Sequence, residues 1–312
     1  MITKIHTKDH DEWLALRAQY LGGSDAAAVV GLNPYVSPFA LWAEKTGQRP
    51  PFEGNLATKT GAYLEEFVAK LFEEETGKKV RRETASLFNS DYPWAIANVD
   101  RVVVGEDAGL EIKTCSSLST KRFKGGEFPT NYYVQCMHYL AVTGKSRWYL
   151  AVLIGNYDFR TFTIERDEDE IRSLMDAECA FMRDYVTAKV APPVDGMEPT
   201  DDTLKAIYPE SDGSEITLFN RDSLLDRYFD IEAQIKSLKA DQDTIRQAIQ
   251  LDMGSAETAV ADRYKVTWKT QTRTTFDAKK YTQDHPDLDL SPYWKQSAPT
   301  RAFRIYKTSK ED

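Results

Sequence analysis

The sequence predicts an α/β or α+β fold with a central mixed β-sheet flanked by helices. Three observations support this class. Residues 1–190 alternate between helical spacing of apolar side chains and short β-rich runs. Their order is helices, a hairpin, a helix and two more strands. The chain of 312 residues is also 41% hydrophobic and 29% charged, which is typical of a globular protein with a sizeable core.

The longest predicted helix of this region precedes the hairpin. Its apolar side chains recur at helical spacing, at Leu64, Phe67, Val68, Leu71 and Phe72. Gly77 stands where a helix C-cap is expected. Upstream, Ser37 and Pro38 predict the start of a shorter helix, and we expect the indole of Trp42 in the core.

The predicted hairpin consists of two β-rich runs, residues 94–104 and 110–114, which flank a turn-forming segment at 105–109. A helix over about 131–142 follows, which Thr130 is predicted to cap and Gly144 to close. Two further runs, at 148–154 and 159–164, complete the predicted sheet.

Beyond residue 190 the pattern changes. Residues 191–215 are largely polar and carry Pro192 and Pro193 near their start, which favours a linker. Residues 216–312 are expected to form a C-terminal part with a helical arm over about 219–252 and a small β extension. In the arm, spacings of four and three alternate as in a coiled-coil seam, at Leu224, Tyr228, Ile231, Ile235, Leu238, Gln242, Ile245 and Ile249. We expect this stripe to pack on the protein's own body; self-association and partner binding remain alternatives.

Two aromatic and basic runs, at 264–269 and 302–307, predict the strands of the β extension. Such a hairpin can contact DNA or simply pack on the rest of the protein.

Composition also argues against several classes of protein. No run approaches the ~18 apolar residues of a membrane span, and residues 1–10 are polar, so we expect a cytoplasmic protein without a membrane partner. The three cysteines, Cys115, Cys136 and Cys179, are widely spaced and predict reduced thiols. The net charge of -9 disfavours nonspecific coating of nucleic acid but allows a local basic path, such as residues 78–82 or 121–124.

Asp100, Glu111 and Lys113 form the strongest chemical signal. Carboxylates on the adjoining strands of a hairpin can hold Mg²⁺, which activates water for attack on a phosphodiester. Residues two apart on a strand share a face, so Lys113 projects beside Glu111 and can hold or help deprotonate that water. Each residue alone has a more ordinary explanation, as a surface ion pair or a turn former.

Neighbouring helices add to this signal. The segment 61–65 places Glu65 on the helix before the hairpin, where its carboxylate can reach a metal directly or through water. Gln135 and Tyr139 lie at i and i+4, on one face of the helix after it. Taken singly, Glu65 is an ordinary surface acid, and the other two pack against the core.

With these motifs in order, the chain resembles the PD-(D/E)xK nuclease superfamily and, more narrowly, the lambda exonuclease and YqaJ-type phage recombination nucleases. The resemblance covers roughly residues 10–190. It implies a restriction-endonuclease-like core whose metal and catalytic centre consists of Glu65, Asp100, Glu111, Lys113 and Gln135, with the three acids as metal ligands. The proline usual before the aspartate is Val99 here, which changes a turn preference and removes no ligand.

The amino-terminal region narrows the resemblance. Trp13, Arg17 and the segment 22–28 are similar to the W-x-x-x-R and G-G-S-D-A-A segments of the YqaJ group. Ser24 stands where a helix N-cap belongs, and its hydroxyl, the free N–H groups and the Arg17 guanidinium form an anion site. The resemblance implies that this pocket receives the 5′-phosphate of DNA, and we assign Tyr139 to DNA binding as well.

The implied activity is that of a Mg²⁺-dependent 5′-to-3′ exonuclease acting on the ends of linear double-stranded DNA, with Mn²⁺ as a substitute. The resemblance further implies a single-strand annealing protein of the phage as partner, a homo-oligomer such as a ring trimer, and action in the cytoplasm of the host cell.

Two alternatives stay open. One is another nuclease of the superfamily, either RecB-like or a restriction-type endonuclease; three badly spaced cysteines cannot hold the four-cysteine iron-sulfur cluster that many RecB-like members carry. The other is a non-catalytic scaffold that binds DNA ends, against which the retained acids and lysine count.

Overall fold

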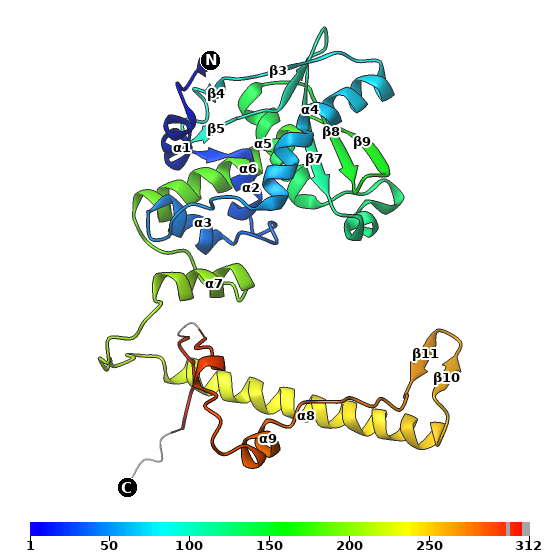
Figure 1. The fold of residues 1–312 in the computed structure, drawn as a ribbon. Coiled ribbons are helices and arrows are strands. Elements are labelled where there is room, and N and C mark those ends of the chain that lie inside the picture. The colour runs from blue at the N-terminus through cyan, green and yellow to red at the C-terminus, as the bar shows by residue number, and fades with distance from the viewer. Residues whose placement is uncertain (298–299, 308–312) are drawn as a thin grey trace. The chain divides into compact units, whose positions relative to one another are not determined.

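The computed structural model describes residues 1–297 and 300–307. The chain divides into two compact units, Met1–Pro209 and Glu210–Asp312, which we call unit 1 and unit 2 (Figure 1). None of the helices described combines the length and apolar character that a membrane span requires.

Unit 1 is built on a five-stranded sheet with the order β3-β6-β7-β8-β9. Its strands are Val80–Arg82 (β3), Arg101–Val103 (β6), Ala108–Cys115 (β7), Arg147–Ile154 (β8) and Asp158–Glu165 (β9). Strands β7 and β8 run parallel, whereas the other neighbouring pairs are antiparallel. The predicted α/β class with a central mixed sheet is therefore confirmed.

The alternation of side chains along β8 explains why helices cover both faces of the sheet. Trp148, Leu150, Val152 and Ile154 pack in one core cluster, and Tyr149, Ala151 and Leu153 in another. Successive side chains of a strand point to opposite faces. The first cluster includes α2 (Gly23–Val29), α5 (Thr130–Thr143) and α6 (Glu168–Phe181), and the second includes α4 (Leu56–Thr76) (Figure 1).

Smaller elements surround this core. Strand β1 (Ile2–Ile5) pairs with β4 (Ser86–Asn89), and β2 (Leu21–Gly22) pairs with β5 (Ala95–Ile96). The other elements of unit 1 are α1 (His10–Gln19), α3 (Pro38–Lys45), the turns η1 (Ser117–Gly126) and η2 (Met182–Thr187), and α7 (Glu198–Ile207). Helix α3 begins after its N-cap Ser37, and Trp42 is buried, as the sequence predicts.

The predicted hairpin and the long helix before it are confirmed, but two details differ. The run at 94–104 is broken, because β5 pairs with β2 in another sheet before the chain bends toward β6. Thr130 does not cap α5: the N-cap is Pro129, without a side-chain hydrogen bond. Gly77 and Gly144 close their helices with φ values of 70° and 68°, left-handed conformations that favour glycine.

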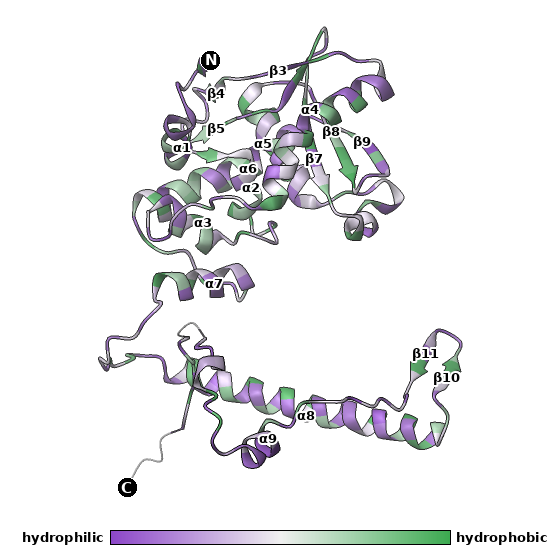
Figure 2. Cartoon of the chain, in the orientation of Figure 1, coloured by the Kyte–Doolittle hydropathy of each residue, from purple (hydrophilic) through white to green (hydrophobic). Residues whose placement is uncertain are grey.

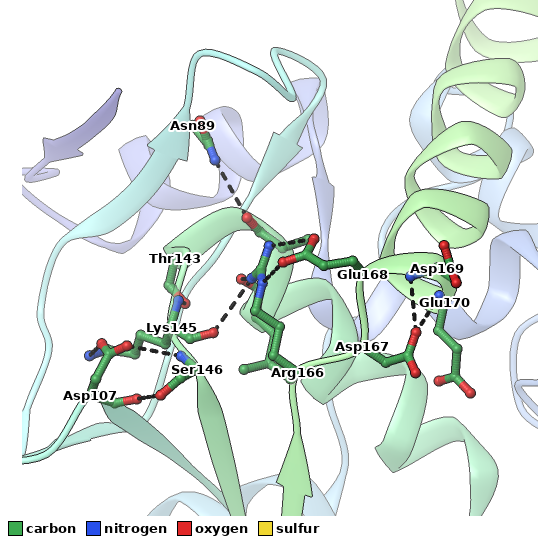
Figure 3. A network of polar contacts seen from close by, with 12 residues as sticks. Asn89, Asp107, Thr143, Lys145, Ser146, Arg166, Asp167, Glu168, Asp169 and Glu170 are labelled. Carbon is green, nitrogen blue, oxygen red and sulfur yellow. Dashed lines mark hydrogen bonds and ion pairs between the residues drawn. The ribbon is translucent and has the colours of Figure 1, made fainter.

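The carboxy-terminal end of α5 is fixed by a polar network (Figure 3). Arg166 donates to the carbonyl of Leu140 and pairs with Glu168. The backbone N–H of Ser146 and its hydroxyl bind Asp107, in the turn between β6 and β7, at 3.0 Å each. This network anchors α5 to the sheet, and α5 carries Gln135 and Tyr139.

Residues 191–215, expected to be a linker, contain helix α7. Leu204 and Ile207 of α7 pack against the cluster that includes Trp42, and Thr200 donates to Ser37 at 2.7 Å. This segment is therefore part of unit 1 up to Pro209.

Unit 2 contains the long helix α8 (Asp222–Met253), the antiparallel pair β10 (Thr258–Ala261) and β11 (Tyr264–Thr267), α9 (Ala278–Asp284) and the turn η3 (Ser291–Tyr293). The predicted strand at 302–307 is wrong, since this segment has no regular structure. Strand β11 pairs instead with the weakly apolar run β10, which begins soon after α8 ends.

Candidate active site

Asp100 and Glu111 face each other across β6 and β7. Asp100 lies at the bend before β6, and its Oδ2 accepts a hydrogen bond of 2.8 Å from the backbone N–H of Ile112. Because the register pairs Arg101 with Leu110, it places Asp100 opposite Glu111. The spacing in the sequence therefore brings the two carboxylates together.

Of these two carboxylates, that of Glu111 is buried and that of Asp100 is half-buried. Glu111 is 2% exposed, and its Oε2 has no hydrogen-bond partner. Burial, and then the charge of Glu111, raises the pKa of Asp100 well above its usual range. Two adjacent acids that repel each other are strongly stabilised by a bound cation.

The other oxygen of Glu111 is held by two donors. Nζ of Lys113 lies 2.5 Å from Glu111 Oε1, and Nε2 of Gln135 donates to the same atom at 2.8 Å. Burial opposes the charge of Lys113, but Glu111 and then Asp100 outweigh it and raise the pKa of the ammonium. Lys113 is therefore a cation in this arrangement.

Tyr139 lies behind Gln135. Its hydroxyl accepts a hydrogen bond of 2.9 Å from Gln135 Nε2, and the residue is only 4% exposed. The structure thus places Tyr139 in the core, where it supports Gln135, and this differs from the DNA contact expected from the sequence.

Glu65 projects from α4 toward the same region. Gly61, one turn earlier, allows α4 to approach β7, because a Cβ there would lie 3.3 Å from Thr114 Oγ1. The Glu65 carboxylate pairs with the guanidinium of Arg101. Glu65 is therefore close to the site but is engaged by a cationic side chain.

Arg101 is the residue that sequence reasoning missed. Its side chain is 4% exposed, and it pairs with both Glu65 and Glu66 and donates to the carbonyl of Asp100 at 2.8 Å. An arginine beside a strand acid has no distinctive spacing, so no sequence signal would have identified it. Its role is to tie α4 to the bend that carries Asp100.

Two clefts meet at Glu65 and Asp100. One, of about 450 Å³, is lined by α4 and by the end of β7, including Lys113. The other, of about 260 Å³, extends toward Trp13 and Arg82. The acids thus lie where two open surfaces join, as an extended substrate requires.

The residues fit a hard divalent cation. Asp100 and Glu111 supply carboxylate oxygens, and the unpartnered Glu111 Oε2 is an orphaned buried acceptor. Within the described residues, no three side chains of the metal-ligating types converge into one group. The donor set is therefore two carboxylates, with Glu65 nearby as the third acid.

The structure brings together Arg17 and Ser24, the two residues of the predicted anion pocket. Arg17 Nη2 donates to Ser24 Oγ at 2.6 Å, and it lies 3.6 Å from Asp25. Ser24 is not the helix cap that the sequence predicts: the N-cap of α2 is Gly22, whose N–H donates to Asp25 Oδ2 at 3.1 Å. Asp25 is also neutralised by Lys45 at 2.9 Å.

Short contacts link this pocket to the acids. A Cβ on Gly23 would lie 2.5 Å from the ring of Tyr139, so α2 packs directly on the residue that supports Gln135. On the other side, Arg17 stacks over the ring of Trp13, whose Nε1 donates to Asn98 at 3.2 Å. The pocket is therefore positioned by both α5 and the segment before Asp100.

Comparison with known proteins identifies the family. The model of the YqaJ-like viral recombinase domain matches residues 12–146. A protein of Bacillus subtilis (strain 168), named YqaJ, is 38% identical over 294 residues, which are 92% of each chain. The chain belongs to the YqaJ family. The resemblance to the YqaJ group that was inferred from the sequence motifs is thereby confirmed.

Solved structures support the fold of this YqaJ-family protein. The alkaline exonuclease LHK-Exo from Laribacter hongkongensis, in its crystal structure with dAMP, is 22% identical with a TM-score of 0.50. The match covers 58% of this chain and 94% of that chain. At this level of identity the likeness concerns the fold alone.

Proposed function

We propose that this YqaJ-family protein is a Mg²⁺-dependent exonuclease that degrades linear double-stranded DNA from the 5′ end. The observation that carries the proposal is the pair Asp100 and Glu111: Oε2 of the buried Glu111 is free, and Lys113 lies beside its Oε1. This donor set, at the junction of two clefts, suits phosphodiester hydrolysis better than a purely structural role.

Asp100 and Glu111 would hold Mg²⁺, for which Mn²⁺ can substitute, with Glu65 as a third acid reached directly or through water. When bound, the cation stabilises negative charge on the phosphate and lowers the pKa of water. Lys113, kept protonated by its two acidic neighbours, donates hydrogen bonds to the attacking water or to a phosphate oxygen. Gln135 keeps Glu111 oriented so that Oε2 faces the site.

The anion pocket would set the direction of digestion. Arg17 and the hydroxyl of Ser24 can bind a terminal phosphate, while Lys45 and Asp25 neutralise each other beneath them. A pocket that holds the 5′-phosphate near the acids places a phosphodiester of the same strand within their reach. Digestion then leaves a 3′ single strand.

Such single strands are substrates for strand annealing, so we propose a phage single-strand annealing protein as partner. We also propose a homo-oligomer, for which a ring trimer around DNA is the arrangement that the resemblance suggests. The basic residues of η1, which follows β7, offer a path for the DNA backbone.

The test uses linear duplexes labelled at either end, with or without a 5′-phosphate, in Mg²⁺, Mn²⁺ or EDTA. We expect metal-dependent release from the 5′ end, faster with the phosphate, and no cutting of closed circular DNA. Lys113→Ala should abolish release, whereas the exposed Lys70→Ala on α4 should not.

Equal cutting of circles would mean an endonuclease, and DNA-end binding without cutting would mean a scaffold. Arg17→Ala should remove the preference for a 5′-phosphate; the exposed Arg172→Ala is its matched control. If Arg17→Ala keeps the preference, the assignment of the pocket is wrong.

A further inference from the structure

Helix α8 of unit 2 carries an apolar stripe, visible as hydrophobic positions that recur among hydrophilic ones in Figure 2. Each of these side chains is between 37% and 68% exposed: Leu224, Tyr228, Ile231, Ile235, Leu238, Ile245 and Ile249. A contiguous exposed stripe of this kind marks a surface that meets a partner. These exposures describe α8 within unit 2, where Gln242, Ile245 and Ile249 also line a cleft with Trp268 of the segment after β11. The expectation that the stripe packs on the protein's own body stays a prediction.

We propose that α8 forms a parallel, in-register, two-stranded coiled coil with α8 of a second copy of this chain. The seam runs from Leu224 to Ile249, roughly 38 Å at 1.5 Å per residue. Its a positions are Tyr228, Ile235, Gln242 and Ile249, and its d positions are Leu224, Ile231, Leu238 and Ile245. The central layers, Ile235 at a and Leu238 at d, have the pattern that favours two strands, whereas Ile231 and Ile245 place isoleucine at d.

The charges that flank the seam fit a parallel pair. In that arrangement, each g residue faces the e residue five positions later on the other helix. Arg227 then faces Glu232 of the second copy, and Asp241 faces Arg246 of the second copy. Arg246 now pairs with Asp243 of its own helix, at 2.8 Å, and its guanidinium has further donors for Asp241.

Gln242 selects the same arrangement. In a parallel, in-register pair, a positions face a positions, so the two Gln242 amides meet and can donate to and accept from each other. In any antiparallel pair, a positions face d positions, and every d residue of this seam is aliphatic. Gln242 would then lie against leucine or isoleucine without a polar partner, which costs free energy.

Disulfide trapping in the full-length protein tests the orientation. Under mild oxidation, Leu224→Cys and Ile249→Cys should each form a covalent dimer, because the two copies of each residue lie side by side. Ser237→Cys, at an outward c position, and the wild-type protein with its free cysteines are the controls. A mixture of the two seam variants should form no 224–249 disulfide, since these positions lie roughly 38 Å apart in a parallel pair.

A 224–249 disulfide would show an antiparallel pair and overturn the proposal. Seam variants that cross-link no more than Ser237→Cys would show that the stripe docks elsewhere, on the protein itself or on another partner, and would overturn it equally.

Light scattering provides an independent test. Substituting both Ile235→Glu and Leu238→Glu should halve the mass, from a dimer to a monomer or, if unit 1 forms the ring trimer proposed above, from two joined rings to one; an unchanged mass contradicts the proposal. Arg227→Glu should weaken association roughly tenfold, because two attractive pairs become repulsive. Adding Glu232→Arg should restore it, and failure of this charge reversal would count against the parallel register.

Discussion

Gln135 donates a hydrogen bond from Nε2 to Oε1 of Glu111 over 2.8 Å, and this contact decides which oxygen of the carboxylate remains free. Lys113 binds the same Oε1, so both donors leave Oε2 without a partner. Helix α5, which otherwise packs as a core element, thus fixes the orientation of Glu111, the proposed metal ligand on β7.

Replacing this donor should impair the reaction without affecting DNA binding. Gln135→Leu keeps the volume but leaves Glu111 held by Lys113 alone, so we expect kcat to fall on the order of tenfold to a hundredfold, as for other residues that orient metal ligands. The KM for DNA should stay unchanged. Tyr139→Phe, which keeps the bond from Gln135 to Glu111, is the control and should retain most of the activity.

The close packing of α2 on α5 makes Gly23 sensitive. A methyl group there would meet the ring of Tyr139 at 2.5 Å, and overpacking of this kind costs about 1–3 kcal/mol. We expect Gly23→Ala to lower the free energy of unfolding by this amount and to reduce activity. Adding Tyr139→Leu should recover stability, as urea titration can measure; a double variant no more stable than Gly23→Ala would refute the contact.

Arg101 should matter for stability. Its buried guanidinium binds the partly exposed Glu65 and the exposed Glu66, so Arg101→Leu leaves Glu65 unpaired beside two other acids. Removing one member of such a partly buried pair costs about 1–3 kcal/mol. Urea unfolding of Arg101→Leu measures this loss. Arg172→Leu, which breaks an exposed pair with Asp169, should change little. Equal effects of the two variants would contradict the account.

His138 should make stability depend on pH. Burial would lower its pKa, but the carboxylate of Glu178, 2.8 Å from Nδ1, outweighs burial and raises it. A raised histidine pKa contributes stability that is complete below the unfolded-state pKa of about 6.5 and is lost as pH rises through the folded-state pKa. We therefore expect the free energy of unfolding to fall as pH rises above 6.5.

Glu178→Gln identifies the source of this dependence. The amide keeps the size of the side chain but not its charge, so the loss of stability above pH 6.5 should disappear from urea titrations of the variant. Burial then lowers the pKa of His138, and stability should instead fall below pH 6.5. A wild-type protein and a Glu178→Gln protein with the same slope against pH would show that His138 is not responsible.

Local patterns in the sequence were sufficient for the sheet and the acids. The hairpin spacing predicted both acids on adjoining strands, but the register that sets Asp100 opposite Glu111 came from the structure. The orientation of the Glu65 side chain was not predictable from the sequence, because it depends on an ion pair with Arg101, which lies 36 residues away. The burial of Tyr139 likewise depends on how closely Gly23 lets α2 approach.

The C-terminal part was harder to predict for a related reason. The heptad spacing predicted helix α8 within a few residues of its observed bounds, Asp222–Met253. What covers its stripe depends on another surface, which periodicity does not describe. The strand expected at 302–307 failed because alternating residues alone do not supply a pairing partner.

The most direct test of the account compares the wild-type protein with Glu111→Gln, which keeps the shape of the side chain and removes its charge. Release of label from linear duplex DNA is followed in Mg²⁺ and in EDTA, together with binding to the DNA ends. We predict that the variant binds ends normally but releases label slower by a factor on the order of a hundred or more, and that EDTA stops the wild-type protein. Digestion by Glu111→Gln at the wild-type rate, or by the wild-type protein in EDTA, would contradict the assignment of the site.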